Sequence, residues 1–275
     1  MSDSCAILAG AGSFPFHVAE HAHRSGVRVI ALGIAGWVDP ALAARVDVYE
    51  EIAIGQLGRL IERLKAHQVR QIVMAGKVTK GVLLDPRVQF DAEAIQVLGR
   101  AGGTSVNAVL GAVAERLAKD GIALLDSSTF LQRELCPIGV VTRRHPTPEE
   151  EASIAAGVVI ARSLAAADVG QSLAIKGRVV VAVEALEGTD AMLQRAGQLA
   201  GPGCLLVKMA SPTQDRRFDL PVIGPTTLEV AITAGIVGLA LEAGSTLLLE
   251  KDALIQKADA AGLAIVGIEP PSGTS

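Results

Sequence analysis

Charged side chains gather in the second half of the sequence, in a pattern that could act on a phosphate anhydride. The pattern runs Glu187-Gly188-Thr189-Asp190, then Lys208, then Gln214-Asp215-Arg216-Arg217-Phe218-Asp219-Leu220-Pro221. Hydrolysis of an anhydride needs positive groups that offset charge on the phosphoryl oxygens, and a positioned water molecule. Lys208 and Arg217 could supply the first, and Asp219 or Asp190 could hold Mg²⁺ or orient the water. The candidate residues are therefore Asp219, Asp190 and Lys208 for catalysis, Asp219 for the metal, and Glu187, Gly188, Thr189, Gln214 and Arg217 for substrate binding.

The same residues also have an ordinary structural interpretation. Thr189 or Asp190 would cap a helix. The arginine-rich stretch would be a surface loop held by ion pairs, which contribute little to stability. Spacing alone does not separate the two interpretations.

Two glycine turns in the first half could bind phosphate through the backbone. Gly10-Ala11-Gly12-Ser13-Phe14-Pro15 lies between an apolar strand pattern and a helical pattern, where backbone amides and the helix dipole favour anions. Gly76-Lys77-Val78 follows another strand pattern, and ligands of parallel sheets gather at the carboxyl ends of the strands. A turn without a ligand and a solvated lysine are the simpler alternatives. The candidate substrate-binding residues here are Gly10, Gly12, Ser13, Gly76, Lys77 and Val78.

Two nucleotide motifs are incomplete in these turns. A dinucleotide fingerprint requires a third glycine where Pro15 stands, and an acidic residue at the end of the second strand, which reads Ala31-Leu32-Gly33. A Walker A loop is excluded, because Gln71 and Val78 occupy the places of its first glycine and its Ser or Thr.

A possible zinc motif follows the first glycine turn. His17, Glu20 and His21 have the H-x-x-E-H spacing of inverted zinc peptidases, which places both imidazoles on one helix face. No third ligand is identifiable downstream, so a partly exposed helix face is the simpler interpretation.

Apolar periodicity predicts two α/β domains. In the first half, expected strands cover 6–9, 27–32, 71–75 and 122–125, and expected helices cover 16–24, 57–67 and 106–119. This alternation is typical of a Rossmann-like parallel sheet with helices. In the second half, expected helices cover 149–166 and 252–261, and expected strands cover 179–183, 205–208, 236–241, 247–249 and 264–268.

A change of composition marks the boundary between the two domains. Pro137, Pro146 and Pro148 interrupt a segment that also contains paired arginines and three consecutive glutamates. We therefore predict an N-terminal nucleotide-contacting domain at 1–134, a linker at 135–150, a C-terminal catalytic α/β domain at 151–269 and a flexible tail at 270–275.

Composition narrows the class of protein. Of 275 residues, 50% are hydrophobic and 20% charged, which suffices for a sizeable core. A net charge of −4 without a basic cluster argues against a nucleic-acid partner. Three widely spaced cysteines and the absence of a signal-like start predict a cytoplasmic protein. The longest uncharged apolar run, 230–241, is shorter than the roughly 20 residues of a membrane span, so membrane contact would be peripheral.

Two long blocks, 183–191 and 207–224, resemble the LpxI family of UDP-2,3-diacylglucosamine pyrophosphatases. The resemblance continues through Ala9–Pro15, Ala75–Val78 and a later segment containing Glu242-Ala243-Gly244, and it ends at Ile268. It implies a Mg²⁺-dependent hydrolase of lipid A biosynthesis that splits UDP-2,3-diacylglucosamine into UMP and 2,3-diacylglucosamine 1-phosphate. It also implies that Asp219 is the family's essential aspartate.

One departure from the family limits what the resemblance implies. Many relatives carry Gly-Asp-Asp where this chain reads Gly102-Gly103-Thr104-Ser105, so no acidic role is carried over to that loop. The expected partner is a small lipid-bearing nucleotide sugar, with peripheral contact at the inner membrane, and homo-oligomer formation is left open.

Two other classes of function stay open. A nucleotide-dependent oxidoreductase is compatible with a Rossmann-like first half, although the missing ribose acid weakens it. A non-catalytic nucleotide-sugar or lipid-binding protein would bind stoichiometrically without turnover. Binding of NAD(H) would identify the first, and release of UMP would exclude the second.

Overall fold

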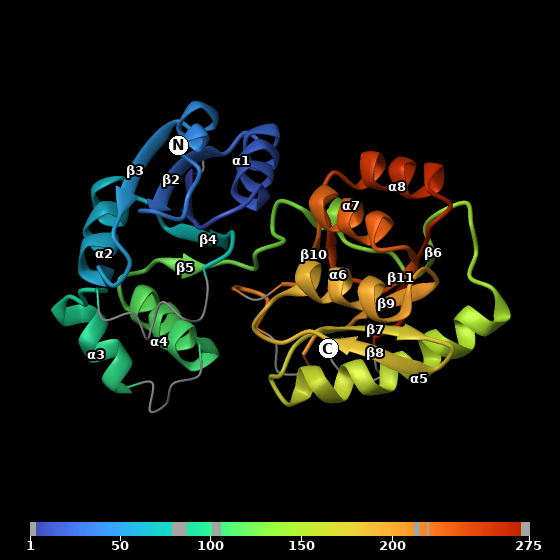
Figure 1. Ribbon diagram of the computed structural model, residues 1–275. Coiled ribbons are helices and arrows are strands. Elements are labelled where there is room, and N and C mark those ends of the chain that lie inside the picture. The colour runs from blue at the N-terminus through green and yellow to red at the C-terminus, as the bar shows by residue number, and fades with distance from the viewer. Residues whose placement is uncertain (1–3, 79–86, 101–105, 212–214, 219, 271–275) are drawn as a thin grey trace. The chain divides into compact units, whose positions relative to one another are not determined.

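The computed structural model describes residues 4–78, 87–100, 106–211, 215–218 and 220–270. The chain divides into two compact units by the contacts between its residues. Unit 1 comprises Met1–Leu131 and Asp215–Asp219, and unit 2 comprises Gln132–Gln214 and Leu220–Ser275. Each unit is an α/β structure (Figure 1). A short piece of the second half of the sequence thus belongs to the first unit.

Unit 1 is built on a five-stranded parallel sheet, which we call sheet A, in the order β3-β2-β1-β4-β5. Its elements are β1 (Ser4–Ala9), α1 (Phe14–Arg24), β2 (Arg28–Ile34), a 3-10 helix (Pro40–Arg45), β3 (Val48–Ile52), α2 (Leu57–Ala66), β4 (Gln71–Ala75), α3 (Ala92–Arg100), α4 (Val106–Lys119) and β5 (Ala123–Leu124). The strand order reverses between β1 and β4. Doubly wound sheets bind ligands at the carboxyl ends of the strands that flank such a reversal.

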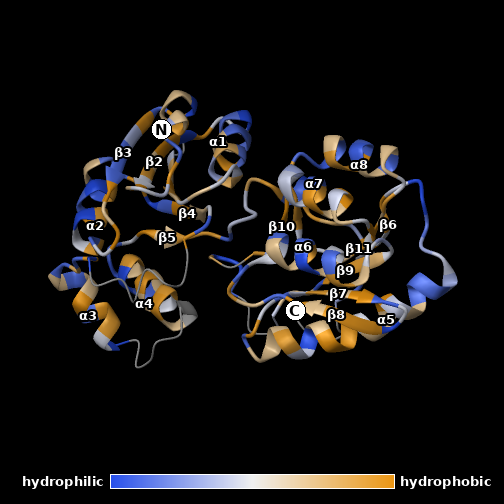
Figure 2. Cartoon of the chain, viewed as in Figure 1, coloured by the Kyte–Doolittle hydropathy of each residue, from blue (hydrophilic) through white to orange (hydrophobic). Residues whose placement is uncertain are grey.

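Apolar spacing explains why unit 1 folds this way. In α2, Leu57, Leu60, Ile61 and Leu64 are buried, which is the spacing of one helix face. They pack with buried residues of β2, including Ile30, in one core. Figure 2 shows hydrophobic colour on much of β2 and on β5, and hydrophilic colour on much of α1 and α2.

The predicted strands and helices of the first half are present, and the described residues add three elements: the 3-10 helix Pro40–Arg45, β3 and α3. The strand β3 reads Val-Tyr-Glu-Glu-Ile and is the edge strand of sheet A, paired only with β2 among the described strands. Because an edge strand is half solvated, it lacks the continuous apolar run that identifies a central parallel strand. The helix α3 was also not predicted.

Unit 2 contains a six-stranded mixed sheet, which we call sheet D, in the order β6-β13-β11-β9-β7-β8. The strands β9, β11 and β13 are parallel, whereas β7 runs antiparallel to β8 and β9, and β6 antiparallel to β13. Its elements are a 3-10 turn (Gln132–Glu134), β6 (Gly139–Val140), α5 (Pro148–Ala166), β7 (Ser172–Lys176), β8 (Val179–Val183), α6 (Thr189–Ala200), β9 (Cys204–Lys208), β10 (Val222–Ile223), α7 (Pro225–Thr233), β11 (Ile236–Glu242), β12 (Leu247–Leu248), α8 (Lys251–Ala260) and β13 (Ala264–Ile268). The strands β10 and β12 form a separate parallel pair.

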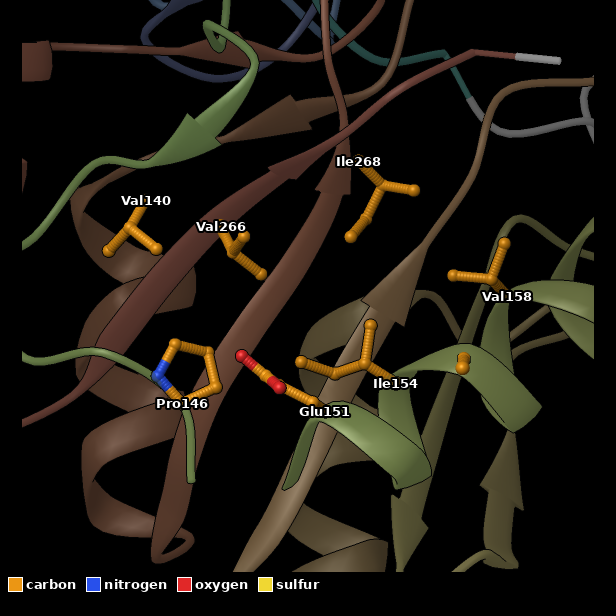
Figure 3. A pocket seen from close by; sticks show the side chains of 8 residues that line it. Val140, Pro146, Glu151, Ile154, Val158, Val266 and Ile268 are labelled. Atoms are coloured by element: carbon orange, nitrogen blue, oxygen red, sulfur yellow. The ribbon is translucent and has the colours of Figure 1, made fainter. Parts of the chain in front are cut away.

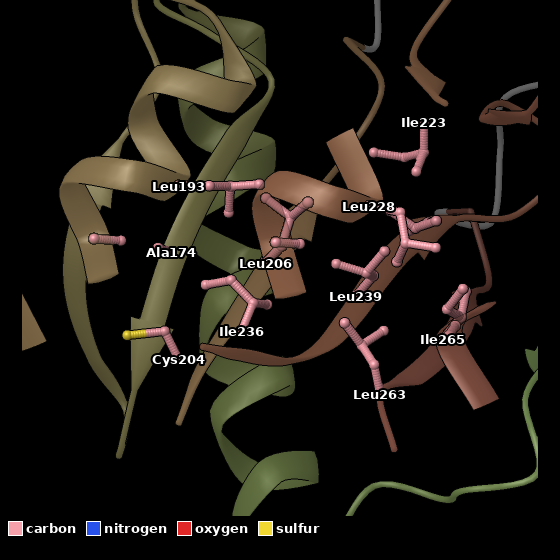
Figure 4. Packing of buried hydrophobic residues seen from close by; sticks show 14 of the residues in the cluster. Ala174, Leu193, Cys204, Leu206, Ile223, Leu228, Ile236, Leu239, Leu263 and Ile265 are labelled. Carbon is pink, nitrogen blue, oxygen red and sulfur yellow. The ribbon is translucent and has the colours of Figure 1, made fainter. Parts of the chain in front are cut away.

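Sheet D is covered on both faces. The residues of β9 alternate between two cores, because successive side chains of a strand point to opposite faces. Leu206 packs with Leu193 of α6 and Leu228 of α7 (Figure 4). Leu205 and Val207 pack instead in the core that contains α5. The same core contains Leu254 of α8, so α6, α7 and α8 cover one face of the sheet and α5 covers the other.

The segment 135–150, predicted as a linker, packs in unit 2. Cys136 is buried and its amide donates to Thr246 O at 2.8 Å. Gly139–Val140 pair with β13, and the Val141 amide donates to Ile265 O at 2.8 Å. The prolines therefore interrupt secondary structure here without separating the chain from its sheet.

The long apolar run at 230–241 is not one element. It includes the end of α7 and most of β11, joined by Gly235 with φ of +74°. Across the described ranges, we find no helix that combines the length and apolarity needed to cross a membrane. The structure confirms the strands predicted as β8, β9, β11, β12 and β13 and the helices predicted as α5 and α8. The elements β6, β7, β10, α6, α7 and the 3-10 turn were not predicted.

Candidate functional site

The two glycine turns lie side by side at the carboxyl edge of sheet A. The Gly10 amide donates to Ala75 O at 2.8 Å, and Ala11 and Lys77 exchange two backbone hydrogen bonds at 2.9 and 3.0 Å. Gly76 has a φ of +97°, and a Cβ there would lie 2.7 Å from the carbonyl carbon of Gly10. Only glycine permits this conformation and this approach. The turns predicted separately are therefore one backbone platform.

The platform leads into α1. Gly12 and Ser13 are exposed, and Ser13 caps the helix without a side-chain hydrogen bond. Pro15 has no N–H, and the amides of Phe16 and His17 donate to Ser13 O. The amides of residues 12–14 thus remain as candidate donors to phosphate, next to the positive end of the helix dipole.

The segment 215–218 packs at the same edge. The Ser127 amide donates to Arg216 O at 2.9 Å, and Arg216 Nε donates to Asp126 Oδ2 at 2.8 Å. Asp126 and Ser127 follow β5 after one intervening residue, Leu125. Phe218 packs against the core of sheet A. The arginine-rich stretch is therefore anchored to unit 1.

Arg217 forms an ion pair within this segment. Its Nε lies 2.9 and 3.0 Å from the two carboxylate oxygens of Asp215, and its guanidinium lies over the Phe218 ring at 5.8 Å from the centroid. Hydrogen bonding from Arg217 lowers the pKa of Asp215 below its usual value. Asp215 is thus a carboxylate at neutral pH. It neutralises part of the positive charge of Arg217, the residue that we assigned to phosphate binding.

In unit 2, Lys208 lies inside a polar network. Its side chain is only 6% exposed. Its Nζ donates to Ser172 Oγ and to Thr189 Oγ1, both at 3.0 Å, and lies 3.7 Å from Glu184 Oε2. Thr189 in turn donates to Glu184 Oε1 at 2.9 Å. A buried ammonium surrounded in this way holds β7, β9 and the start of α6 together.

The other predicted residues of this stretch lie at the start of α6. Gly188 is its N-cap, with φ of +84° and no side-chain cap bond, so neither Thr189 nor Asp190 has the capping role considered above. Asp190 lies in the first turn, where the helix dipole favours a carboxylate. Glu187 pairs with Arg195 on the surface, and hydrogen bonds from its own backbone amide and from Arg195 lower its pKa.

A buried carboxylate in unit 2, Glu242, was not among the predicted site residues. It ends β11, is 5% exposed and lies 3.9 Å from Arg162 Nε of α5. Burial raises the pKa of Glu242 above its usual value, against the opposing effect of Arg162. The signals in the sequence were its place directly after the predicted strand 236–241 and within the segment that resembles the family.

An apolar hollow lies on the α5 face of sheet D (Figure 3). It has a volume of about 360 Å³ and is lined by Val140, Pro146, Glu151, Ile154, Ala155, Val158, Val266 and Ile268. None of the residues predicted to bind substrate lines it. It is therefore not part of the candidate site.

The cysteines and the potential metal ligands were also considered as catalytic groups. All three cysteines are free and buried, and burial raises the pKa of Cys5 to about 12 and of Cys136 to about 11, so both stay protonated at neutral pH. Within the described ranges, no three His, Cys, Asp or Glu side chains are grouped to hold a metal ion. The zinc interpretation of His17, Glu20 and His21 therefore has no support.

Two of the predicted site residues, Gln214 and Asp219, lie outside the described residues, as does the loop 101–105. The others separate into two groups. Gly10, Gly12, Ser13, Gly76, Lys77, Val78 and Arg217 belong to unit 1, and Lys208, Glu187, Gly188, Thr189 and Asp190 belong to unit 2. Sequence reasoning missed Asp126, Ser127 and Glu184, whose roles depend on contacts between distant segments. The polar run after the β5 pattern was the available signal for the first two.

Comparison with known proteins gives a consistent result over nearly the whole chain. Family models described as LpxI N-terminal domain and LpxI C-terminal domain match residues 4–134 and 137–266. A protein of Caulobacter vibrioides named UDP-2,3-diacylglucosamine pyrophosphatase LpxI is 30% identical over 280 residues, covering 96% of this chain and 97% of that protein.

Solved structures give weaker similarities. A glycinamide-RNase-transformylase T from Mycobacterium tuberculosis matches with 16% identity and a TM-score of 0.25, covering 66% of this chain and 44% of that one. CobK precorrin-6A reductase matches with 11% identity and a TM-score of 0.28, covering 99% and 89%. These scores are too low to support an argument about fold or function.

Proposed function

The chain belongs to the LpxI family, and we propose that it hydrolyses the pyrophosphate of UDP-2,3-diacylglucosamine to UMP and 2,3-diacylglucosamine 1-phosphate. The activity named for the Caulobacter relative supports the substrate, because the similarity covers both units. The reaction belongs to lipid A biosynthesis.

One structural observation carries the proposal furthest. The glycine platform and the segment that precedes Asp219 meet at the carboxyl edge of sheet A, since Ser127 bonds both to the segment and to Met74 of β4. A pyrophosphate bound by the amides of residues 12–14 would thus lie at the edge to which Arg216–Phe218 are anchored. We assign Asp219 to the reacting centre, where it would orient the attacking water.

We further propose that the reaction requires Mg²⁺. The described carboxylates do not form a metal site by themselves, because Asp126 and Asp215 are both paired with arginine. Mg²⁺ usually binds one or two carboxylates together with substrate phosphates and water. Asp219 would be the protein ligand, and Mg²⁺ would offset the negative charge on the phosphoryl oxygens.

The decisive experiment is incubation with UDP-2,3-diacylglucosamine and Mg²⁺, followed by mass analysis of both products. We expect UMP and 2,3-diacylglucosamine 1-phosphate in equal amounts. Binding without either product would favour the carrier function. A parallel reaction in chelator, after metal removal, should lose most of the activity, and full activity there would refute the metal requirement alone.

An oxidoreductase function has less support. β2 ends at Gly33 and Ile34, so the acidic residue that would bind a nicotinamide ribose is missing from that position. Fluorescence titration with NADH would test this alternative, and saturable binding would revive it.

We also propose peripheral contact with the inner membrane from a cytoplasmic location, because a diacylated substrate partitions into bilayers. Sedimentation with lipid vesicles, with and without substrate, would test this contact. Equal recovery in the supernatant with and without vesicles would argue against it.

A further inference from the structure

The segment 215–218 is anchored to unit 1 by residues that sequence reasoning did not assign. Ser127 is 3% exposed, and its Oγ lies 2.9 Å from both Arg217 O and Met74 O. A hydroxyl has one hydrogen, so it donates to one carbonyl at a time and the two acceptors share it. The Ser127 amide adds a second link, to Arg216 O. One buried serine thus binds two successive carbonyls of a segment about 90 residues away in sequence.

Asp126 adds a charged contact to the same anchor. Its Oδ2 accepts from Arg216 Nε at 2.8 Å, while its Oδ1 accepts from the amide and hydroxyl of Ser128 at 2.7 and 2.6 Å. Ser128 is fully buried, so it fixes the orientation of the carboxylate. Arg216 Nη2 lies 3.3 Å from Ser128 Oγ, which closes the network. Charge-assisted bonds of this kind are stronger than neutral ones.

The anchor also fixes the segment relative to the glycine platform. Met74, whose carbonyl shares the Ser127 hydroxyl, lies in β4 immediately before Ala75 and Gly76. The Ala75 carbonyl accepts the Gly10 amide. Consequently, the Ser127 hydroxyl shared between Arg217 O and Met74 O, the strand β4 and the Gly10–Ala75 hydrogen bond together connect the Arg217 backbone to the first glycine turn.

We propose that Asp126 and Ser127 are positioning residues for hydrolysis: they hold Arg216–Phe218 at the carboxyl edge of sheet A, beside the glycine platform. They need not touch the substrate. This inference rests on the proposed function, because it assigns their effect to that reaction. The position of such a segment matters, since displacing a catalytic group by about 1 Å can lower the rate 10²-fold.

The test compares Ser127→Ala with Ser153→Ala in the full-length enzyme. Ser153 is a matched control, because it is 2% exposed and its hydroxyl also donates to a backbone carbonyl, Glu149 O, but lies on α5 of unit 2. We expect Ser127→Ala to lower kcat at least tenfold with KM changed less than threefold, whereas Ser153→Ala keeps kcat near wild type. A folded Ser127→Ala enzyme with wild-type kcat would overturn the inference.

Asp126→Asn and Arg216→Lys extend the test if Ser127→Ala does not fold. The Arg216 side chain is 39% exposed, so its replacement should leave the core intact. Each change should lower kcat, and the double variant should lose little more than the worse single one, because both remove the same contact. Additive losses, or wild-type rates in both single variants, would contradict a shared positioning role.

Hydrogen exchange separates this inference from the proposed function. Ser127→Ala should speed exchange in a peptide covering 215–218 while leaving α5 unchanged, and this readout does not depend on turnover. Unchanged exchange would refute the anchor even in an active enzyme. Faster exchange in a protein whose wild type hydrolyses no substrate would support the anchor and refute the proposed function.

Discussion

The carboxyl edges of the two sheets are built in different ways. At the edge of sheet A, the predicted residues contribute backbone: Gly10 and Gly76 allow two turns to touch, and Gly12 and Ser13 are exposed. At the edge of sheet D, the predicted Lys208 is buried among side chains that satisfy it. An exposed backbone edge can receive a ligand, whereas a buried ion network holds the fold. The first edge should therefore control turnover and the second should control stability.

Asp219→Ala should have the largest effect. We expect turnover to fall by three orders of magnitude or more, about 4 kcal/mol in the transition state, while substrate still binds, because a transition-state interaction lowers kcat more than affinity. Single-turnover hydrolysis, substrate binding and melting temperature would be measured on one preparation.

Asp252→Ala provides the control for this experiment, since Asp252 is exposed in the first turn of α8. Asp215→Ala is less suitable, because Asp215 bonds Arg217 within the anchored segment. Near-normal turnover by folded Asp219→Ala would remove Asp219 from the mechanism.

Lys208→Met should chiefly affect stability. It would leave the Glu184 carboxylate, which is 13% exposed, without its cation, and breaking a buried ion pair typically costs about 3 to 5 kcal/mol. Denaturant unfolding should show this loss, and adding Glu184→Gln should restore part of it. Retained stability together with a large fall in kcat would return Lys208 to the catalytic role predicted from the sequence, and would weaken the contrast between the edges.

Two glycine substitutions test the backbone platform. Both positions have positive φ, which costs a side chain roughly 1 to 2 kcal/mol. Gly76→Ala adds a contact of 2.7 Å with Gly10, whereas a Cβ at Gly12 meets nothing within 4 Å. We expect Gly76→Ala to destabilise unit 1 more than Gly12→Ala by thermal unfolding. Equal melting temperatures would show that the two turns are not pressed together.

The smallest predicted effect is on the pH dependence of stability. Hydrogen bonding from Arg63 lowers the pKa of Glu50 in unit 1 to about 2, so its stabilisation is present above about 4.5 and is lost as pH falls towards 2. Burial raises the pKa of Glu242 in unit 2, so its ionisation destabilises the fold as pH rises from about 4.5 through that raised value.

Glu50→Gln and Glu242→Gln should therefore change the pH profile in opposite directions. Melting temperatures between pH 3 and 8 would reveal the difference: Glu50→Gln should lose stability mainly at neutral pH, whereas Glu242→Gln should flatten the decline above about pH 4.5. Parallel profiles for the two variants would show that these carboxylates do not distinguish the units.

The sequence alone determined many of the strands and helices, and it indicated the family. Strand β1, helix α2 and strand β9 have apolar spacings that only one secondary structure can bury, so local pattern was sufficient. Gly10 and Gly76 were identified as turns because each follows an apolar strand. The blocks at 183–191 and 207–224 were long enough to indicate the family, which the comparisons then showed.

Only the tertiary structure decided which of these residues meet. The segment 215–218 lies in the second half of the sequence but is anchored by Asp126 and Ser127 of unit 1, and no local pattern encodes a contact across about 90 residues. The same holds for Lys208, whose burial depends on Ser172, Thr189 and Glu184 arriving from other elements. Hydrophobic periodicity and turn-forming residues act over a few positions of the sequence. The burial of a side chain and its ion pairs are set only when distant strands come together in one sheet.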